Sequence, residues 1–133
     1  NQEVIELFDT FVLSYWCNHA TADDDNIALL EHMEGKKIII IGTLGAARES
    51  AHGQKVCENV ENLVRAHNTL VGHYLCRGSI DLARTARRLR IPEGEKGHLS
   101  PERFEKQKES LGHPNAEELA QCQAEVKEFL KAL

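Results

Sequence analysis

The clearest structural signal in this sequence is an apolar run that ends in a glycine-rich turn, Lys36-Lys37-Ile38-Ile39-Ile40-Ile41-Gly42-Thr43-Leu44-Gly45-Ala46. Its consecutive isoleucines leave no polar face, so the run predicts a strand covered on both sides, as in parallel sheets that lie between helices. The small residues that follow let another molecule approach the backbone closely. Because ligands bind beyond the carboxyl ends of strands in open α/β sheets, this turn is the first candidate ligand site.

The composition indicates one globular domain, residues 1–133, that is long enough to bury a core. A formal net charge of −5 argues against a general nucleic-acid binder. No apolar run approaches membrane-spanning length, so we expect no membrane association. Four scattered cysteines favour free thiols in the reducing cytoplasm over a disulfide framework or a zinc site. The cysteines are Cys17, Cys57, Cys76 and Cys122.

Strand and helix patterns alternate along the chain. They predict strands over residues 8–16, 38–41 and 69–76, a polar loop over 17–22, helices over 23–33, 51–67 and 100–110, and a basic helix or turn over 80–90. Gly35 is expected to end the first helix. The last helix begins at Asn115, with Glu118 completing a capping box, and its apolar stripe comprises Leu119, Cys122, Val126, Phe129, Leu130 and Leu133. The order of elements predicts an α/β fold with a parallel sheet and helices on both faces.

Four segments of the chain together resemble the flavodoxin family. They are residues 11–16 (Phe-Val-Leu-Ser-Tyr-Trp), 21–23 (Thr-Ala-Asp), the central run 37–46, and 75–81 (Leu-Cys-Arg-Gly-Ser-Ile-Asp). They look like the third to fifth strands of a flavodoxin-like domain, closest to single-domain bacterial flavodoxins. The resemblance implies a three-layer sandwich around a parallel sheet, non-covalently bound FMN, and electron exchange with a redox protein partner, either a reductase or an acceptor.

The sequence departs from the family at the phosphate end of the expected site. Flavodoxins hold the FMN phosphate with a loop of the type Thr-x-Thr-Gly-x-Thr after the first strand, and no such stretch exists here. The glycine-rich candidates, residues 42–45 and 92–97, do not join an opening strand to a helix. Backbone amides and a helix N-terminus normally neutralise this phosphate. We therefore expect one of two explanations. Either the chain lacks roughly its first forty to fifty residues, judged from a normal β-α-β unit with its leading loop, or this homologue has lost tight FMN binding. We favour the truncated chain.

The resemblance places the flavin ring between the ends of three strands. Trp16 would stack on the ring, Asn18 and His19 would reach its edge, and N–H groups of the turn at residues 43–46 would tune its redox chemistry. The residues expected to bind the cofactor are Trp16, Cys17, Asn18, Thr43, Leu44, Gly45, Ala46, Cys76, Arg77 and Gly78. Purely structural roles stay open for all of them: a core or lid aromatic for Trp16, a tight turn for the glycines, and a surface ion pair for Arg77.

Two charged clusters have simpler interpretations than a binding site. Arg84, Arg87, Arg88 and Arg90 could dock an acidic redox partner, although a solvated helix face is the plainer explanation. The acidic residues 23–25 complement a helix dipole. Because the histidines show no HxH or HExxH spacing, we predict no metal site.

Functions from different classes stay open at this point. The resemblance implies an FMN-binding electron carrier rather than a stand-alone enzyme. The alternatives are a cofactor-free interaction module, a flavin-dependent reductase that acts directly on a small substrate, and a hydrolase or transferase that uses Cys17 or His19. The last lacks any pairing of a nucleophile with a base.

Overall fold

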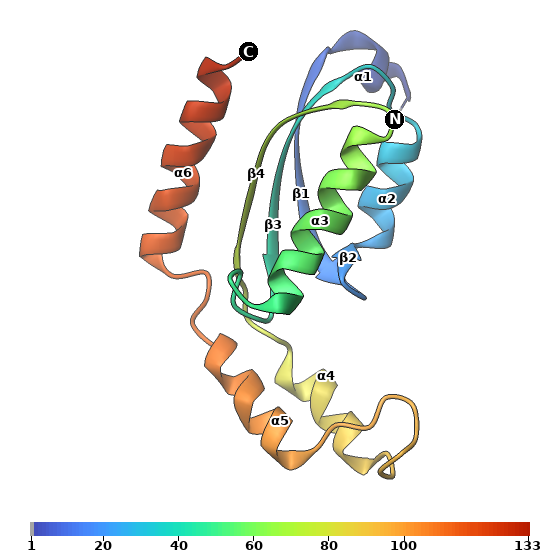
Figure 1. Ribbon diagram of the computed structural model, residues 1–133, viewed down its shortest axis with the longest axis vertical. Helices are drawn as coiled ribbons and strands as arrows, with labels where there is room; N and C mark the ends of the chain where they lie inside the picture. The colour runs from blue at the N-terminus through green and yellow to red at the C-terminus, as the bar shows by residue number, and fades with distance from the viewer. Residues whose placement is uncertain (1) are drawn as a thin grey trace.

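A four-stranded sheet organises the computed structural model, which describes residues 2–133 (Figure 1). The strands are β1 (Thr10–Asn18), β2 (Thr21–Ala22), β3 (Lys37–Leu44) and β4 (Thr69–Arg77). The helices are α1 (Gln2–Leu7), α2 (Asp24–Glu31), α3 (Ala51–Arg65), α4 (Leu82–Ala86), α5 (Pro101–Gln107) and α6 (Ala116–Lys131), with 3-10 turns η1 (Arg87–Arg90) and η2 (Lys108–Ser110). The sheet order is β2-β1-β3-β4, in which β1, β3 and β4 are parallel and β2 is antiparallel. The α/β fold predicted from the sequence is confirmed.

The central strand β3 is buried on both faces, as its isoleucines predict. Ile38, Ile39 and Ile40 have no solvent-exposed surface. On one face, Ile38 and Ile40 pack into a core with the fully buried valines of α3, which are Val56, Val60 and Val64. On the other face α6 packs against β4, and Figure 1 shows α2 and α3 on the side of the sheet opposite to α6. The layers are therefore helices, sheet and helix.

The start of the fold differs from the sequence-based expectation in two ways. Residues 2–7 form helix α1, and β1 begins at Thr10 rather than at residue 8. Residues 17–22 are not a loop, because β1 continues through Asn18 and turns back into β2. His19 and Ala20, at the tip, have φ values of 50° and 62°. Two successive positive φ values match the twist of a tight hairpin. The sequence lacks the Asn-Gly or Gly-Gly pair that usually indicates such a turn.

Side-chain caps define the ends of the helices. Asp23 caps α2 by accepting from the Asn26 N–H, and Ser100 caps α5, where Pro101 takes the first position. The predicted capping box at α6 is confirmed, since Asn115 and Glu118 each accept from the other's backbone N–H. These ends follow from local sequence alone.

Two predicted helix ends were wrong. The capping residue of α2 is His32, and Gly35, at φ 69°, lies beyond it in the connection to β3. Helix α3 ends at Arg65 rather than at His67, which is exposed. Asn68 directs the chain into β4, because its side-chain oxygen accepts from the Lys36 N–H at 3.0 Å.

The face of the sheet on the side of α6 is only partly covered. Register aligns Val12 with Ile39 and Ile39 with Gly72, where the Phe129 ring of α6 packs closely. Val12 is nevertheless 51% exposed. None of the α6 residues is buried, and its predicted apolar stripe leaves Leu119 60% exposed. Helix α6 therefore covers β4 and leaves β1 open on this face.

Helices α4 and α5 project beyond the carboxyl ends of the strands (Figure 1). We call residues 79–115 the arm. Its connection to the sheet is fixed by Ser110, which is fully buried, accepts from the Ile80 N–H at 2.9 Å and donates to the Gln107 carbonyl. Across residues 2–133, no helix is both long enough and apolar enough to span a membrane.

Candidate functional site

The parallel register brings the ends of three strands to one edge of the sheet. Trp16 of β1 lies opposite Thr43 of β3, and Thr43 lies opposite Cys76 of β4. The ten residues expected to bind a cofactor occupy these three strand ends and the turns that follow them. Spatial grouping does not assign their role, so flavin binding by these residues stays a prediction.

The first strand end presents an accessible aromatic side chain. Trp16 is 53% exposed, and its backbone N–H donates to the Asp23 carboxylate at 3.1 Å, which fixes the start of α2 against the strand. The next residue, Cys17, is half-buried. Burial raises the pKa of its thiol, and a hydrogen bond from the Ala20 backbone only partly opposes this. A raised thiol pKa disfavours the thiolate, so Cys17 is a poor nucleophile.

The turn after β3 is held tightly against the arm. A Cβ placed on Gly45 would lie 2.6 Å from the Ile80 side chain, so glycine is required here for close approach. Beyond it, the N–H groups of Ala46 and Ala47 have no acceptor among residues 2–133. Backbone donors without an acceptor can bind an electron-rich ring edge or an anion.

The end of β4 carries structural contacts of its own. The Gly78 N–H donates to the Leu44 carbonyl at 2.7 Å, which joins the two neighbouring turns. The Arg77 Nε donates to the Gly45 carbonyl at 3.3 Å, and its guanidinium lies 3.7 Å from the Glu109 carboxylate. Arg77 thus connects the sheet edge to the arm, which agrees with the ion-pair alternative recognised in the sequence.

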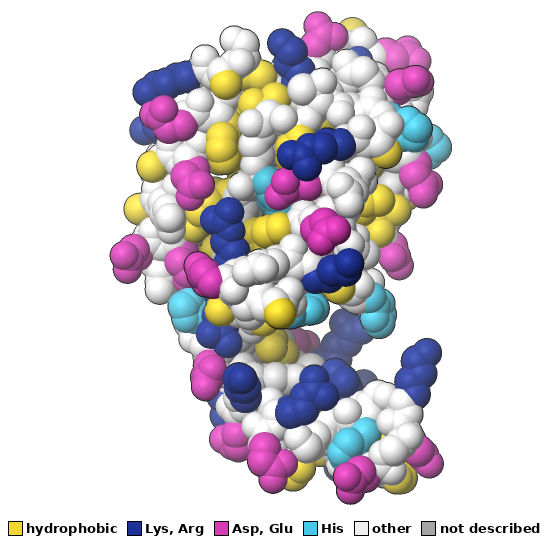
Figure 2. All heavy atoms as spheres, in the orientation of Figure 1, with side chains coloured by type: hydrophobic (Ala, Val, Ile, Leu, Met, Phe, Trp, Pro, Cys, Tyr) yellow, Lys and Arg dark blue, Asp and Glu magenta, His cyan; other side chains and the backbone are white. Residues whose placement is uncertain are grey.

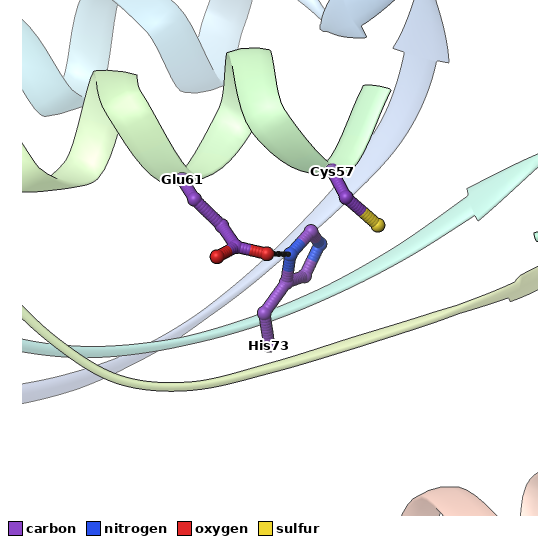
Figure 3. A group of neighbouring side chains, drawn as sticks. All are labelled: Cys57, Glu61 and His73. Atoms are coloured by element: carbon purple, nitrogen blue, oxygen red, sulfur yellow. Dashed lines mark hydrogen bonds and ion pairs between the residues drawn. The ribbon is translucent and has the colours of Figure 1, made fainter. Parts of the chain in front are cut away.

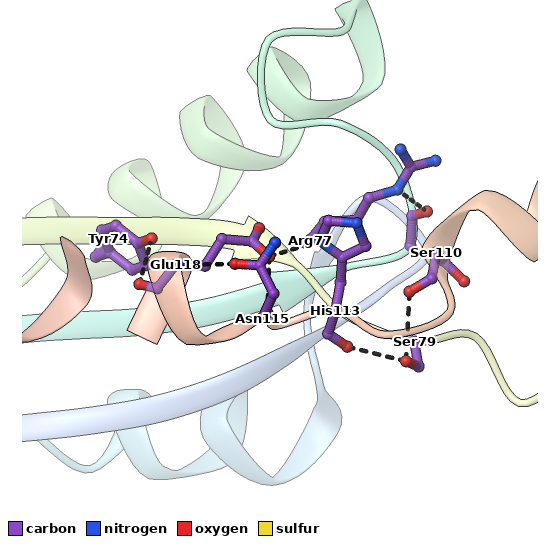
Figure 4. Close-up of polar contacts among 8 residues, drawn as sticks. Tyr74, Arg77, Ser79, Ser110, His113, Asn115 and Glu118 are labelled. Carbon is purple, nitrogen blue, oxygen red and sulfur yellow. Dashed lines mark hydrogen bonds and ion pairs between the residues drawn. The ribbon is translucent and has the colours of Figure 1, made fainter. Parts of the chain in front are cut away.

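A polar network fixes the start of α6 beside this edge (Figure 4). The Tyr74 hydroxyl donates to the Glu118 carbonyl at 2.9 Å, and the Glu118 carboxylate contacts both His113 and the Asn115 N–H. The Ser79 hydroxyl donates to the His113 carbonyl at 2.9 Å. Burial would raise the pKa of Glu118, but the bonds from Asn115 and His113 outweigh it and hold that pKa below its usual range.

Two hollows open near this region. One, of about 240 Å³, lies between β4, the turn before α3 and the start of α6. Its lining comprises Ala47, Arg48, Glu49, Tyr74, Leu75, Cys76, Arg77, His113, Glu118 and Gln121. Of the ten predicted residues, it includes Cys76 and Arg77, whereas Trp16 and the turn at 43–46 lie outside it. The second hollow, of about 440 Å³, is lined by Arg48, Glu49, Gln54, Cys57 and Glu61.

A partly buried polar cluster beneath α3 was not anticipated from the sequence. Tyr15, on β1, reaches across Gly42 so that its hydroxyl lies 2.6 Å from the Nε2 atom of His73, on β4. The Nδ1 atom of the same ring lies 3.0 Å from the Glu61 carboxylate. Burial lowers the pKa of His73, which Glu61 partly opposes, and burial raises the pKa of the Tyr15 hydroxyl.

The cluster also includes Cys57, one turn before Glu61 on the same side of α3 (Figure 3). The Cys-x-x-x-Glu spacing on a helix and a histidine in the following strand were visible in the sequence. Their convergence was not, because it depends on which face of β4 packs beneath α3.

The predicted arginine cluster lies on the arm. Arg84 belongs to α4, whereas Arg87, Arg88 and Arg90 belong to η1, so the basic helix or turn expected there is confirmed. All four are exposed, and none forms an ion pair within residues 2–133. Figure 2 shows Lys and Arg side chains over this lower part of the molecule.

Two comparisons relate the chain to known proteins. A family model described as a flavodoxin domain matches residues 1–129. The flavodoxin-like domain-containing protein BilS of Clostridioides difficile (strain CD3) is 27% identical over 131 residues, which cover 94% of this chain and 72% of that relative.

Proposed function

Because this chain belongs to the flavodoxin family, we propose that it binds FMN at the carboxyl ends of β1, β3 and β4 and exchanges electrons with a redox protein partner, a reductase or an acceptor. The observation that carries the proposal is the register of Trp16, Thr43 and Cys76 across three parallel strands. Ligands of open α/β sheets bind at this edge. A cytoplasmic location is part of the proposal and is supported by four free cysteines.

The residues at this edge fit the ring end of the cofactor. Trp16 offers a half-exposed indole for stacking, and Ala46 and Ala47 offer N–H groups that have no acceptor within residues 2–133. FMN supplies the electron-transfer chemistry when it is bound. The role of this chain is to orient the ring between Trp16 and the turn after β3, and to set the polarity around its edge.

The described residues lack the usual means of binding the FMN phosphate. This sequence contains no Thr-x-Thr-Gly-x-Thr loop, and such loops use backbone amides to neutralise the phosphate. We therefore expect contacts with the flavin ring to provide most of the affinity of these residues for FMN. FMN and riboflavin, which share the ring and differ by the phosphate, should then bind this chain with affinities within about tenfold of each other, a difference of about 1.4 kcal/mol.

The arm supports the proposed electron exchange with a redox protein partner. The four exposed arginines of α4 and η1 lie on the segment that projects beyond the proposed flavin edge, and no carboxylate of the described residues neutralises them. An acidic surface on the partner would complement them. Association that depends on such charges becomes slower and weaker as salt rises.

Flavin titration tests the proposal. Purified protein is added to FMN while the flavin fluorescence is measured, because stacking on Trp16 should quench it. Trp16→Ala should weaken binding by about tenfold or more, from a stacking contribution of about 0.5–1.5 kcal/mol together with the buried area. The control is Phe8→Ala, which removes another exposed aromatic, 56% accessible and outside the strand ends.

The outcomes separate the candidate functions. Flavin binding that is weakened by Trp16→Ala and unchanged by Phe8→Ala supports the flavin proposal. A protein that takes up neither FMN nor riboflavin contradicts it and favours the cofactor-free interaction module.

A further inference from the structure

Cys57, Glu61 and His73 bring three different metal-ligating groups to one place between α3 and β4 (Figure 3). Cys57 and Glu61 are four residues apart on α3 and therefore lie on the same side of the helix. One ligand atom from each of the three side chains lies within 4.8 Å of the other two. Two ligands of one tetrahedral zinc ion are separated by about 3.3–3.8 Å, given Zn–N and Zn–S bonds of about 2.0–2.3 Å. A small movement of the side chains on α3 would close this difference.

The histidine is held as metal-binding histidines usually are. Its Nδ1 atom faces the Glu61 carboxylate at 3.0 Å, whereas Nε2 lies 2.6 Å from the Tyr15 hydroxyl. A ligating histidine commonly uses its second ring nitrogen to hydrogen-bond a neighbouring oxygen, which fixes the tautomer and the ring orientation. Tyr15 provides this oxygen. The ring can thus direct Nδ1 toward a metal without rearranging the strand.

Burial and access also suit a bound ion. The His73 side chain is 5% exposed and that of Glu61 is 27% exposed, so the site is shielded by protein on the side of the sheet. Cys57 and Glu61 also line the hollow of about 440 Å³, which gives an ion a route of entry. With three protein ligands, the fourth tetrahedral position would face that hollow. Three ligands and one open position are the arrangement found in catalytic zinc sites.

The charges are compatible with a divalent ion. A Cys57 thiolate and a Glu61 carboxylate together supply two negative charges, and binding would exchange the thiol proton for the metal. Arg48 also lines the hollow, and its positive charge favours the thiolate form of Cys57 and the neutral form of His73. It would favour an anion or a hydroxide at the open position. Thiolate and imidazole ligands together select zinc over magnesium or calcium.

We propose that Cys57, Glu61 and His73 form a binding site for Zn²⁺ or a chemically similar divalent cation, with a fourth coordination position open to the hollow beside Arg48 and Gln54. The site lies on the α3 side of the sheet. It is separate from the proposed flavin edge, and the two proposals can succeed or fail independently.

Cobalt serves as the spectroscopic probe, since Co²⁺ occupies zinc sites and reports its ligands by absorption. Reduced, metal-free protein is titrated with Co²⁺, and Zn²⁺ is then added to displace it. We expect one Co²⁺ per chain, a thiolate-to-cobalt charge-transfer band, the intense visible bands of four-coordinate cobalt, and loss of all bands when Zn²⁺ is added.

Matched variants identify the ligands. Cys57→Ser should abolish the charge-transfer band, whereas Cys122→Ser, which removes another half-buried thiol on α6, should leave it unchanged. Glu61→Gln should weaken Zn²⁺ binding by at least about tenfold, and Glu58→Gln, an exposed carboxylate on the same helix, should not. Tyr15→Phe should weaken Zn²⁺ binding by about tenfold or more, because it removes the hydrogen bond between the Tyr15 hydroxyl and the His73 ring.

Cys57 is only half-buried, so we expect Cys57→Ser to fold. Circular dichroism verifies its fold before the metal is added. A folded Cys57→Ser protein that keeps the charge-transfer band overturns the proposal. So does a wild-type protein that binds no Co²⁺ or Zn²⁺ at micromolar concentrations.

Discussion

Gly42 lies beneath the Tyr15 ring, and replacing it with alanine should be severely destabilising. A Cβ built at this position would be 2.1 Å from Cζ of Tyr15, and other ring atoms would be within 2.6 Å. Carbon atoms in ordinary contact are about 3.5–4.0 Å apart, so the ring must retreat by more than about 1 Å. Tyr15 is only 5% exposed, and this movement would separate its hydroxyl from His73.

The expected cost of Gly42→Ala has two parts. Overpacking a core costs about 1–3 kcal/mol, and leaving a buried hydrogen-bonding group without a partner costs about 1–3 kcal/mol. The free energy of unfolding should therefore fall by about 2–6 kcal/mol, which is a large fraction of the about 5–15 kcal/mol typical of a domain. Urea unfolding followed by circular dichroism measures this loss, provided that the m-value is unchanged.

A second background separates the ring clash from other effects. In Tyr15→Leu the ring is absent, so Gly42→Ala should cost less than about 1 kcal/mol there, or even stabilise, because glycine in a strand is about 0.5–1 kcal/mol less favourable than alanine. A double-mutant cycle should thus give a coupling energy of more than about 1 kcal/mol. Equal losses in the two backgrounds would refute the explanation.

The remaining predictions concern the polar networks. Tyr15→Phe should lower the free energy of unfolding by about 1–3 kcal/mol, because it leaves the His73 Nε2 atom buried without a partner. An unchanged free energy of unfolding in urea, measured with an unchanged m-value, would contradict this. Asn115→Ala removes the cap of α6 and should cost about 0.5–2 kcal/mol, with faster amide exchange confined to the first turn of that helix. Burial would raise the pKa of Glu118, but the bonds from Asn115 and His113 outweigh it and hold that pKa below its usual range. The carboxylate therefore contributes stability that is present above the pKa of an unfolded glutamate, about 4.3, and is lost as the pH falls through the lower folded pKa. Glu118→Gln should flatten that acid limb in urea unfolding from pH 6 to about pH 2, and an unaltered pH profile would show that the carboxylate contributes nothing.

Features that depend on neighbouring residues in the chain were predictable from the sequence. The isoleucines of β3 require cover on both faces, and both faces of that strand are buried. Asn115 caps α6 as predicted, and Ser100 caps α5 where the predicted helix begins, because capping depends on side chains and N–H groups within three positions of the chain. The family resemblance lay in the same local segments, and the domain match confirms it.

Features that depend on how distant segments pack were not predictable. The apolar stripe of α6 indicated a buried helix, yet Leu119 is 60% exposed, since α6 covers β4 and leaves β1 open. The hairpin at His19 and Ala20 formed without the usual turn residues, because the pairing of β1 with β2 holds both in the left-handed region.

The same distinction applies to the two candidate sites. Trp16 and the turn at residues 43–46 could be placed at one edge from sequence alone, because parallel strands in a predicted order must end together. The convergence of Cys57, Glu61 and His73 could not, since no spacing in the chain links a helix to the strand beneath it. This convergence depends on which face of β4 points inward, and that face is set by a register with β3 that includes an irregularity between Ile38 and Ile39. A shift of one residue in a strand reverses the face to which each side chain points, and that choice is made by tertiary packing.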